Sequence, residues 1–365
     1  MKFECTTTQL FSGVSLTSRF VQKQTNLPIL NSILIIAENN TLILRATNLE
    51  CGVEISIPSK VLQNGSCAVS ANTLLGFLSN TKNNSISSSI IGGVLKLQTD
   101  RASASIKTIP HEDFPTLPRV SAEHSFTLKG TDFARCLRSV LHCAAVSTVK
   151  PELQSIFITG EAGKLSAAAT DSFRLAEKTV LLKSRGGVPP MLIPARNAGE
   201  LSRILEGVNG DVEVYYNENQ ISLQADRIYY TSRLLDGSFP NYKQIVPKEF
   251  LTEAVVLRED LSQTLKGLSV FSDKFMQVSF MVDPKRKIVE FSSRNNDVGE
   301  EECTLKAAVS GEEVRMSFNS RYLGDGLIPI TGESVRLQVN GPGKAMVIKD
   351  ATDDSYTYLA MPMNR

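Results

Sequence analysis

Few residues of this sequence have the types and spacing that catalysis or metal binding requires. It contains three histidines, His111, His124 and His142, and none has a partner at the spacing of metal ligands. A lone histidine is more often structural than a ligand. We therefore expect no metal site and no cofactor at these positions.

Two glycine-containing segments superficially resemble phosphate-binding loops. GEAGKLS, residues 160–166, lacks the G-x-x-x-x-G-K-[ST] spacing, because its glycines stand inside a short turn. GPGK, residues 341–344, is typical of a hairpin turn. The sequence contains no G-x-S-x-G nucleophile elbow. These segments predict turns rather than active-site loops.

An acidic run, Glu300-Glu301-Glu302, is the remaining candidate for metal chemistry. Adjacent carboxylates of a strand point to opposite faces of the sheet, so a solvated edge or a contact surface is the better interpretation. The sequence therefore favours a scaffold over an enzyme.

The bulk composition is that of an ordinary globular protein. The chain has 365 residues, is 42% hydrophobic and 21% charged, and carries a net charge of +1. The six cysteines are scattered without a CxxC pair, so reduced thiols are expected. The beginning of the sequence lacks the apolar core of a signal peptide, and no apolar run is long enough to span a membrane. We expect a cytoplasmic protein.

An internal repeat organises the elements of the chain. Residues 27–55 align without gaps with residues 150–178, so that Leu30 falls on Leu153 and Thr47 falls on Thr170. In both copies alternating apolar residues followed by a turn predict a hairpin. Further copies of short motifs support the repeat: Leu-Gln-x-Asp-Arg at 97–101 and 223–227, and Phe-Pro at 114–115 and 239–240.

The repeat predicts three α+β domains, 1–122, 123–250 and 251–365, of which the third is the most divergent. Each is expected to contain antiparallel strands and two helices. Units of this size are too large for a solenoid, and each can hold its own core.

Three motifs together carry a resemblance to a known family. They are ATDSFRLA at 169–176, LDGSFPNY at 235–242 and YLAMPM at 358–363. With the triple repeat, they resemble the bacterial DNA sliding clamp, the beta subunit of DNA polymerase III, over the full length. The resemblance implies three copies of the DNA clamp fold per subunit. It also implies a homodimeric ring with sheets outside and helices lining a hole for duplex DNA. Such a processivity factor encircles DNA, slides along it, tethers the replicative polymerase, and has no catalytic residues or cofactor.

The low net charge suits such a ring. Each phosphate that a protein neutralises adds salt-dependent affinity, which would oppose sliding. Topological linkage can replace that contact energy, so a net charge of +1 is compatible with DNA binding.

The resemblance also implies a partner-peptide pocket between the second and third domains. By motif match it comprises Leu153, Thr170, Ser172, Phe173, Arg174, Leu175, Pro240, Gln244, Ile245, Leu359, Ala360, Met361, Pro362 and Met363. Ser172 stands where glycine is common in the family, and Gln244 where a basic residue occurs. Methionine is an adaptable apolar residue that suits a surface with many partners.

Two further surfaces follow from the resemblance. The DNA-facing positions are Gln24, Asn72, Arg196 and Arg321. The dimer interface comprises Leu74, Leu78, Ser103, Ser105, Lys107, Val270, Phe271, Glu300, Glu301 and Glu302. Pairing of two open strand edges across a two-fold axis would also protect those edges.

The implied partners are duplex DNA without sequence specificity, a second copy of the chain, the alpha subunit of the replicative polymerase, and the clamp loader. Repair polymerases, mismatch-repair proteins and ligase are further candidates, and no membrane partner is implied. The expected location is the cytoplasm, in association with the nucleoid. Two alternatives are a clamp-like scaffold for repair or mobile-element proteins and, less favoured, a nuclease that uses the carboxylates.

Overall fold

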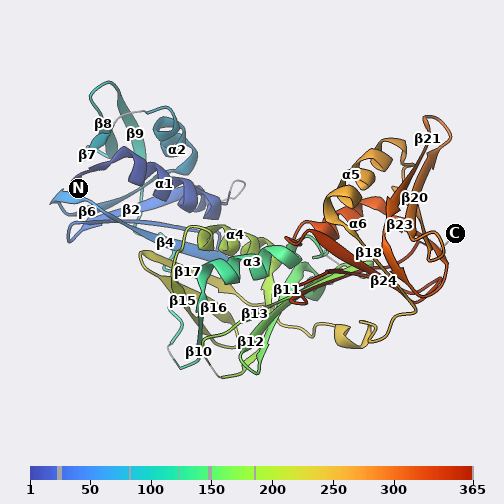
Figure 1. Cartoon of the computed structure of the whole chain (residues 1–365). Helices are drawn as coiled ribbons and strands as arrows, with labels where there is room; N and C mark the ends of the chain where they lie inside the picture. Colours follow the sequence, from blue (N-terminus) through green and yellow to red (C-terminus); the bar gives the residue numbers. More distant parts are fainter. Residues whose placement is uncertain (23–26, 82–83, 122, 147–149, 185, 364–365) are drawn as a thin grey trace. The chain divides into compact units, whose positions relative to one another are not determined.

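The computed structural model describes residues 1–22, 27–81, 84–121, 123–146, 150–184 and 186–363. The chain divides into two compact units (Figure 1). The first comprises residues 1–131 and 203–234, and the second comprises residues 132–202 and 235–365. In the described part of the chain, no helix has the length and apolar character that crossing a membrane requires.

The described residues form six α-helices, two in each predicted repeat. They are α1 (Thr7–Thr17), α2 (Ala71–Ser79), α3 (Gly130–Leu141), α4 (Ala195–Leu205), α5 (Arg258–Leu268) and α6 (Ser320–Leu327). Within the first unit α1 packs against α2, and within the second α5 packs against α6 (Figure 1). The Thr6 hydroxyl caps α1 by accepting a hydrogen bond from Gln9 N, and Leu10 and Val14 of this helix are buried.

The first unit contains an antiparallel sheet of thirteen described strands. Across the sheet they are β10 (Ser125–Lys129), β15 (Asp211–Tyr216), β16 (Gln220–Ala225), β17 (Ile228–Arg233), β4 (Cys51–Pro58), β3 (Thr41–Thr47), β2 (Ser32–Glu38), β6 (Gly65–Ser70), β9 (Ser103–Ile109), β8 (Val94–Gln98), β7 (Ser85–Ile91), β1 (Lys2–Thr6) and β5 (Lys60–Gln63).

The second unit contains two antiparallel sheets in its described residues. The larger has the order β14 (Val188–Pro194), β11 (Ser155–Glu161), β12 (Lys164–Thr170), β13 (Arg174–Leu181), β26 (Tyr356–Ala360), β25 (Met346–Asp350), β24 (Ser334–Val339), β18 (Thr252–Leu257) and β22 (Ala308–Ser310). The smaller has the order β21 (Gly299–Lys306), β20 (Ile288–Asn295), β19 (Gln277–Asp283) and β23 (Val314–Asn319).

The repeat is visible in the strand boundaries. Strands β2, β3 and β4 recur as β11, β12 and β13, with each boundary 123 residues further along the chain. The predicted α+β class is confirmed by these sheets and helices. The two compact units cut across the three predicted repeats, because β4 pairs with β17 and β13 pairs with β26. Each of these pairs joins strands of successive repeats into one sheet.

Candidate functional site

A tight loop between β12 and β13 forms one side of the candidate site. The Thr170 hydroxyl donates to Arg174 O (2.7 Å) and accepts a hydrogen bond from Ser172 N (3.1 Å). Asp171 Oδ1 accepts hydrogen bonds from the backbone N–H groups of Phe173 and Arg174, both at 3.0 Å. Such side-chain bonds to nearby backbone fix a short loop. The Phe173 side chain is left 61% exposed at its tip.

Ser172 has a left-handed backbone in this loop, with φ of 78°. This conformation is strained for residues that carry a Cβ and is free of that strain for glycine. A glycine at this position would therefore be free of the strain that Ser172 carries.

Arg174 is held inward rather than offered to solvent. Its Nε donates to Asp171 Oδ2 (2.9 Å) and its NH1 donates to Asp325 Oδ2 (2.6 Å), while the guanidinium carbon lies 4.4 Å from the ring centre of Tyr322. Burial by itself disfavours the charge, but the hydrogen bonds to Asp325 and Asp171 outweigh it and raise the pKa of Arg174. The side chain is 13% exposed, so its main role within the chain is to anchor the loop.

The C-terminal segment forms the opposite side of the site. In the β13–β26 pair Leu175 lies opposite Leu359, and Arg174 lies opposite Ala360. The chain then leaves the sheet, and Met361 N donates to Phe173 O at 2.8 Å. Leu359 and Ala360 are buried, whereas Met361 is 39% exposed.

A buried cluster of side chains packs beneath both the Phe173 loop and the C-terminal segment. Leu175, Leu359 and Tyr242 pack together with Ala168, Ala345 and Val347. The Tyr242 hydroxyl donates to Glu177 Oε1 at 2.7 Å; burial, with this bond as a second cause, raises the pKa of Tyr242. Tyr242 thereby fixes the segment that carries Pro240, Gln244 and Ile245, all of which are exposed.

Eight of the predicted pocket residues fall into two groups by burial. Phe173, Ile245 and Met361 present apolar surface to solvent. The buried predicted residues belong to the supporting core; they are Leu153, Thr170, Leu175, Leu359 and Ala360.

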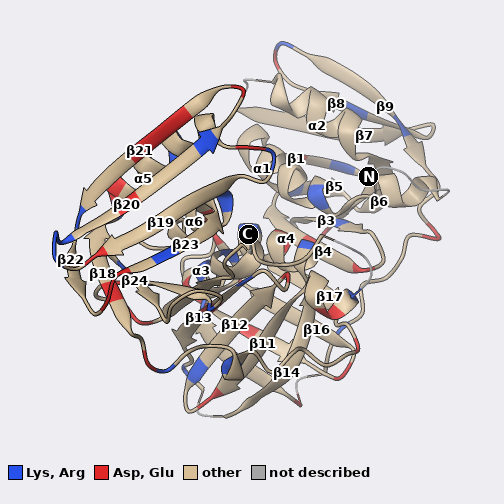
Figure 2. Ribbon diagram, turned by 90° about the vertical axis from the view of Figure 1, so that its right-hand side faces the viewer, with Lys and Arg blue, Asp and Glu red and all other residues tan. Residues whose placement is uncertain are grey.

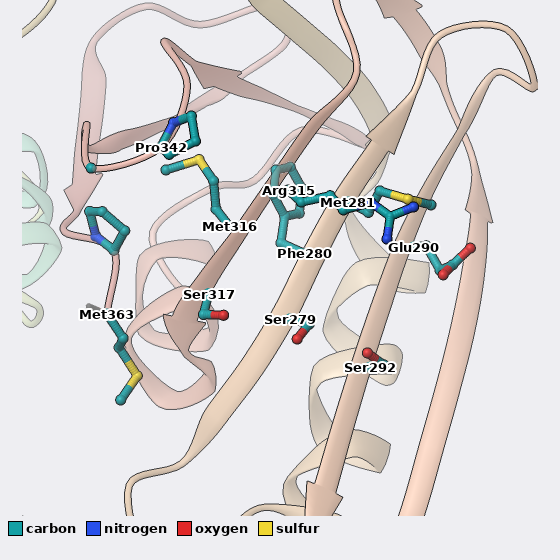
Figure 3. Close-up of a pocket in the computed structure, with 12 residues that line it drawn as sticks. Ser279, Phe280, Met281, Glu290, Ser292, Arg315, Met316, Ser317, Pro342 and Met363 are labelled. Carbon is teal, nitrogen blue, oxygen red and sulfur yellow. The ribbon is translucent and has the colours of Figure 1, made fainter. Parts of the chain in front are cut away.

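The last two predicted pocket residues, Pro362 and Met363, line a cavity of about 490 Å³ (Figure 3). The hydroxyl-bearing residues Ser279, Ser292 and Ser317 line it on the neighbouring strands β19, β20 and β23. Met363 N also donates to Ser317 O at 2.8 Å. The C-terminal segment therefore borders both the Phe173 loop and the β23 sheet.

Several residues that shape the site were not predicted from the sequence. Tyr242 belongs to one of the motifs that carry the resemblance, but the motif did not indicate that its buried ring supports the site. Asp325 and Tyr322 gave no sequence signal, because they meet Arg174 only through the fold, about 150 positions away along the chain.

The first unit contains a second copy of the same loop, with different chemistry. The Thr47 hydroxyl donates to Cys51 O (2.9 Å) and accepts from Leu49 N (3.0 Å), as Thr170 does in the other copy. Arg233 N donates to Glu50 O at 2.8 Å, where Met361 N donates to Phe173 O. Charged residues therefore replace Phe173 and Met361 on an equivalent backbone, which provides a matched control within the chain.

The predicted DNA-facing residues occupy equivalent positions on three helices. Asn72, Arg196 and Arg321 are each the second residue of α2, α4 and α6, and all three are exposed. Gln24 lies outside the described residues. A cluster of three or more side chains able to hold a metal ion is not found in the described part of the chain.

The predicted dimer residues lie on strands β9 and β21, on helix α2, and on the short 3-10 helix Ser269–Phe271 that follows α5. β21 ends the four-stranded sheet, and Figure 2 shows its acidic stretch. Residues 103–107 of β9 pair with β8, and among the described residues their other edge has no strand partner. Leu74 and Leu78 are buried in the first unit, where α2 packs against β9, so they support this edge from within rather than present themselves at a surface.

Comparison with known proteins covers nearly the whole chain. Residues 1–118, 127–241 and 243–364 match the family models of the N-terminal, central and C-terminal domains of the DNA polymerase III beta subunit. The chain belongs to the DNA polymerase III beta subunit family. The predicted recognition and clamp fold are confirmed, and the nuclease alternative is not supported because this family is non-catalytic.

Individual members of the family are distant in sequence. The beta sliding clamp of Synechococcus elongatus is 27% identical over 373 residues, covering 100% of this chain and 99% of the relative. That of Salmonella typhimurium is 26% identical and covers 100% of both. The beta subunit of Thermotoga maritima has a TM-score of 0.94 at 22% identity, covering 100% of this chain and 99% of that one. A Pseudomonas aeruginosa sliding clamp bound to griselimycin has a TM-score of 0.94 at 23% identity, with full coverage of both chains.

Proposed function

We propose that this chain is the processivity clamp of a replicative DNA polymerase, and that Phe173, Ile245 and Met361 form its docking surface for partner peptides. The observation that carries the docking surface is the exposure of these three apolar side chains on a rigid support. Ile245 is 56% exposed although it follows the buried Tyr242 closely. Exposed apolar groups on an ordered frame are the usual anchors of a peptide-binding surface.

The partners are those of a sliding clamp: the alpha subunit of the polymerase, the clamp loader and other proteins with a clamp-binding peptide. Arg174 offers little free charge, since two carboxylates already bind it. We therefore infer that affinity comes mainly from apolar contact, which suits a peptide with Leu and Phe anchors.

The ring is proposed to form when the open edge of β9 in one copy pairs with β21 of the next. Among the described residues, the outer edge of residues 103–107 of β9 and that of β21 have no strand partner within their own units. Ser103, Ser105 and Lys107 are exposed along β9, and Glu300 and Glu302 are exposed along β21. Lys107 is complementary in charge to Glu300 and Glu302, and pairing would remove two edges that invite aggregation.

Within that ring, Asn72, Arg196 and Arg321 would face duplex DNA. Two arginines and one amide per protomer would give a weak, sequence-independent contact that permits sliding. We also propose the domain boundaries 1–122, 123–250 and 251–365, and a location in the cytoplasm beside the nucleoid.

A competition assay with a short Gln/Leu/Phe-type peptide tests the docking surface. Met361→Ala is expected to weaken binding about tenfold, because a side chain that contacts the peptide is lost. The matched control is Arg233→Ala, at the equivalent position of the other loop copy, which should leave affinity unchanged. Equal affinity of wild type and Met361→Ala, or no binding by wild type, would rule out this surface.

A further inference from the structure

Helix α6 is firmly fixed at the end of β23. Asn319 caps the helix, since its Oδ1 accepts hydrogen bonds from Arg321 N and Tyr322 N. Leu323 and Leu327 are buried on its inner side. The helix is therefore a rigid element from which other parts of the second unit can be held.

One side of the docking surface is attached to this helix through Arg174. The Asp325 carboxylate binds Arg174 NH1 at 2.6 Å, with the two side chains 23% and 13% exposed. The guanidinium also lies over the Tyr322 ring. A charge-assisted hydrogen bond in partly buried surroundings is stronger and more directional than a surface ion pair.

The other side is attached to the same helix through Tyr358 of β26. The Tyr358 hydroxyl donates to Tyr322 O at 2.7 Å. Gly326 lies directly against the Tyr358 ring, because a Cβ at this position would come within 2.5 Å of it. Met363 adds a third attachment through its bond to Ser317 O of β23. Both sides of the docking surface are therefore fastened to β23 and α6.

We propose that α6 braces the Phe173 loop and the C-terminal segment, which the bond from Met361 N to Phe173 O already joins, and that Asp325 is the positioning residue that orients the loop through Arg174. This inference rests on the proposed peptide-binding function. The Asp325 carboxylate binds Arg174, which follows Phe173 directly in the loop. The other loop copy lacks this attachment, because Cys51 stands where Arg174 stands.

The test is a double-mutant cycle of peptide affinity on the full-length protein. Asp325→Asn is expected to weaken binding of the Gln/Leu/Phe-type peptide about tenfold, since Arg174 loses a charged partner. Arg174→Met removes the charge but keeps the apolar stem. In that background Asp325→Asn should change affinity less than twofold, because the residue through which it acts is already gone. A purely structural role would weaken binding equally in both backgrounds.

Two controls accompany the cycle. Asp260→Asn, at an exposed position of α5, should leave peptide affinity unchanged. Thermal unfolding of every variant shows that the fold is intact.

The outcomes distinguish a failure of the proposed docking surface from a failure of the positioning role of Asp325. If wild type does not bind the peptide, the proposed docking surface fails, and this inference fails with it. If wild type binds the peptide, the docking surface stands. The positioning role of Asp325 is refuted if the Asp325→Asn protein binds as tightly as wild type, or if the substitution weakens binding equally in both backgrounds.

Discussion

Ser172 and Leu49 share the same left-handed backbone conformation, with φ of 78° and 72°, at equivalent places of two repeated loops. Neither is glycine, so each loop carries backbone strain on the order of 1 kcal/mol. The hydrogen bonds of Thr170 and Asp171 in one copy, and of Thr47 and Asn48 in the other, hold the strained turn in place.

Ser172→Gly is therefore expected to stabilise the protein by about 0.5–1 kcal/mol, since relief of strain exceeds the added freedom of the unfolded chain. Urea unfolding of the variant and of wild type measures this difference. Leu49→Gly serves as a parallel case in the other loop. A loss of stability for Ser172→Gly would show that the serine is not strained.

Thr170→Val should affect both stability and peptide binding. It removes the hydroxyl that bridges Ser172 N and Arg174 O, so Ser172 N loses its acceptor and Arg174 O keeps only the bond from Asp171 N, which costs about 1–3 kcal/mol. Thr47→Val makes the same change in the other loop and should lower stability similarly, but peptide affinity should fall only for Thr170→Val. If the two variants bind the peptide with equal affinity, the order of the Thr170 loop does not determine peptide binding, and the prediction is wrong.

Phe271→Asp should convert the dimer to a monomer. Phe271 packs beside Gly299 at the start of β21, next to the exposed Val270, and burying a carboxylate there in an apolar contact is costly. Light scattering at micromolar concentration measures the mass. Phe275→Asp, an exposed phenylalanine close by, is the control and should stay dimeric. A dimeric Phe271→Asp protein would refute the placement of the interface.

The stability of the fold should depend on pH through His142. Its ring lies 5.7 Å from that of Tyr358, and burial lowers its pKa from 6.5 to about 4, with a further contribution from Arg174 and opposing ones from Asp325 and Asp171. The unfolded chain therefore takes up this proton first as pH falls. The contribution of this group to stability is intact above pH 6.5 and declines toward pH 4, by on the order of 3 kcal/mol.

Unfolding free energies of wild type and His142→Gln across pH 4–8 test this dependence. The decline between pH 6.5 and 4 should be shallower in the variant, whereas His124→Gln, at an exposed position, should follow wild type. Parallel curves for wild type and His142→Gln would contradict the expectation.

The repeat made much of the fold predictable from the sequence. Because strands β2 to β4 and β11 to β13 alternate apolar residues at the same offsets, the residue pattern alone predicts their hairpins. The pairing of β13 with β26 could not be predicted in this way, since antiparallel partners so far apart in sequence leave no local pattern.

The site was predictable only where a motif marked it. Phe173 and Met361 could be proposed from the sequence because they belong to short motifs, and both are exposed in the structure. Asp325 was missed because its role depends on Arg174 coming within hydrogen-bonding distance in the folded chain. Burial could not be predicted from the motifs. Leu74 was expected at the dimer interface and Leu175 in the peptide pocket, but both side chains are buried in the core.

The most direct test of the clamp function is retention on DNA. The protein is loaded with a compatible clamp loader and ATP onto nicked circular DNA, isolated at high salt, and the DNA is then linearised. Topological linkage predicts that the protein stays on circles and is lost from linear ends, despite a net charge of only +1. Loss from circles at high salt after proven loading, or equal retention on both forms, would mean ordinary electrostatic binding and would contradict the account.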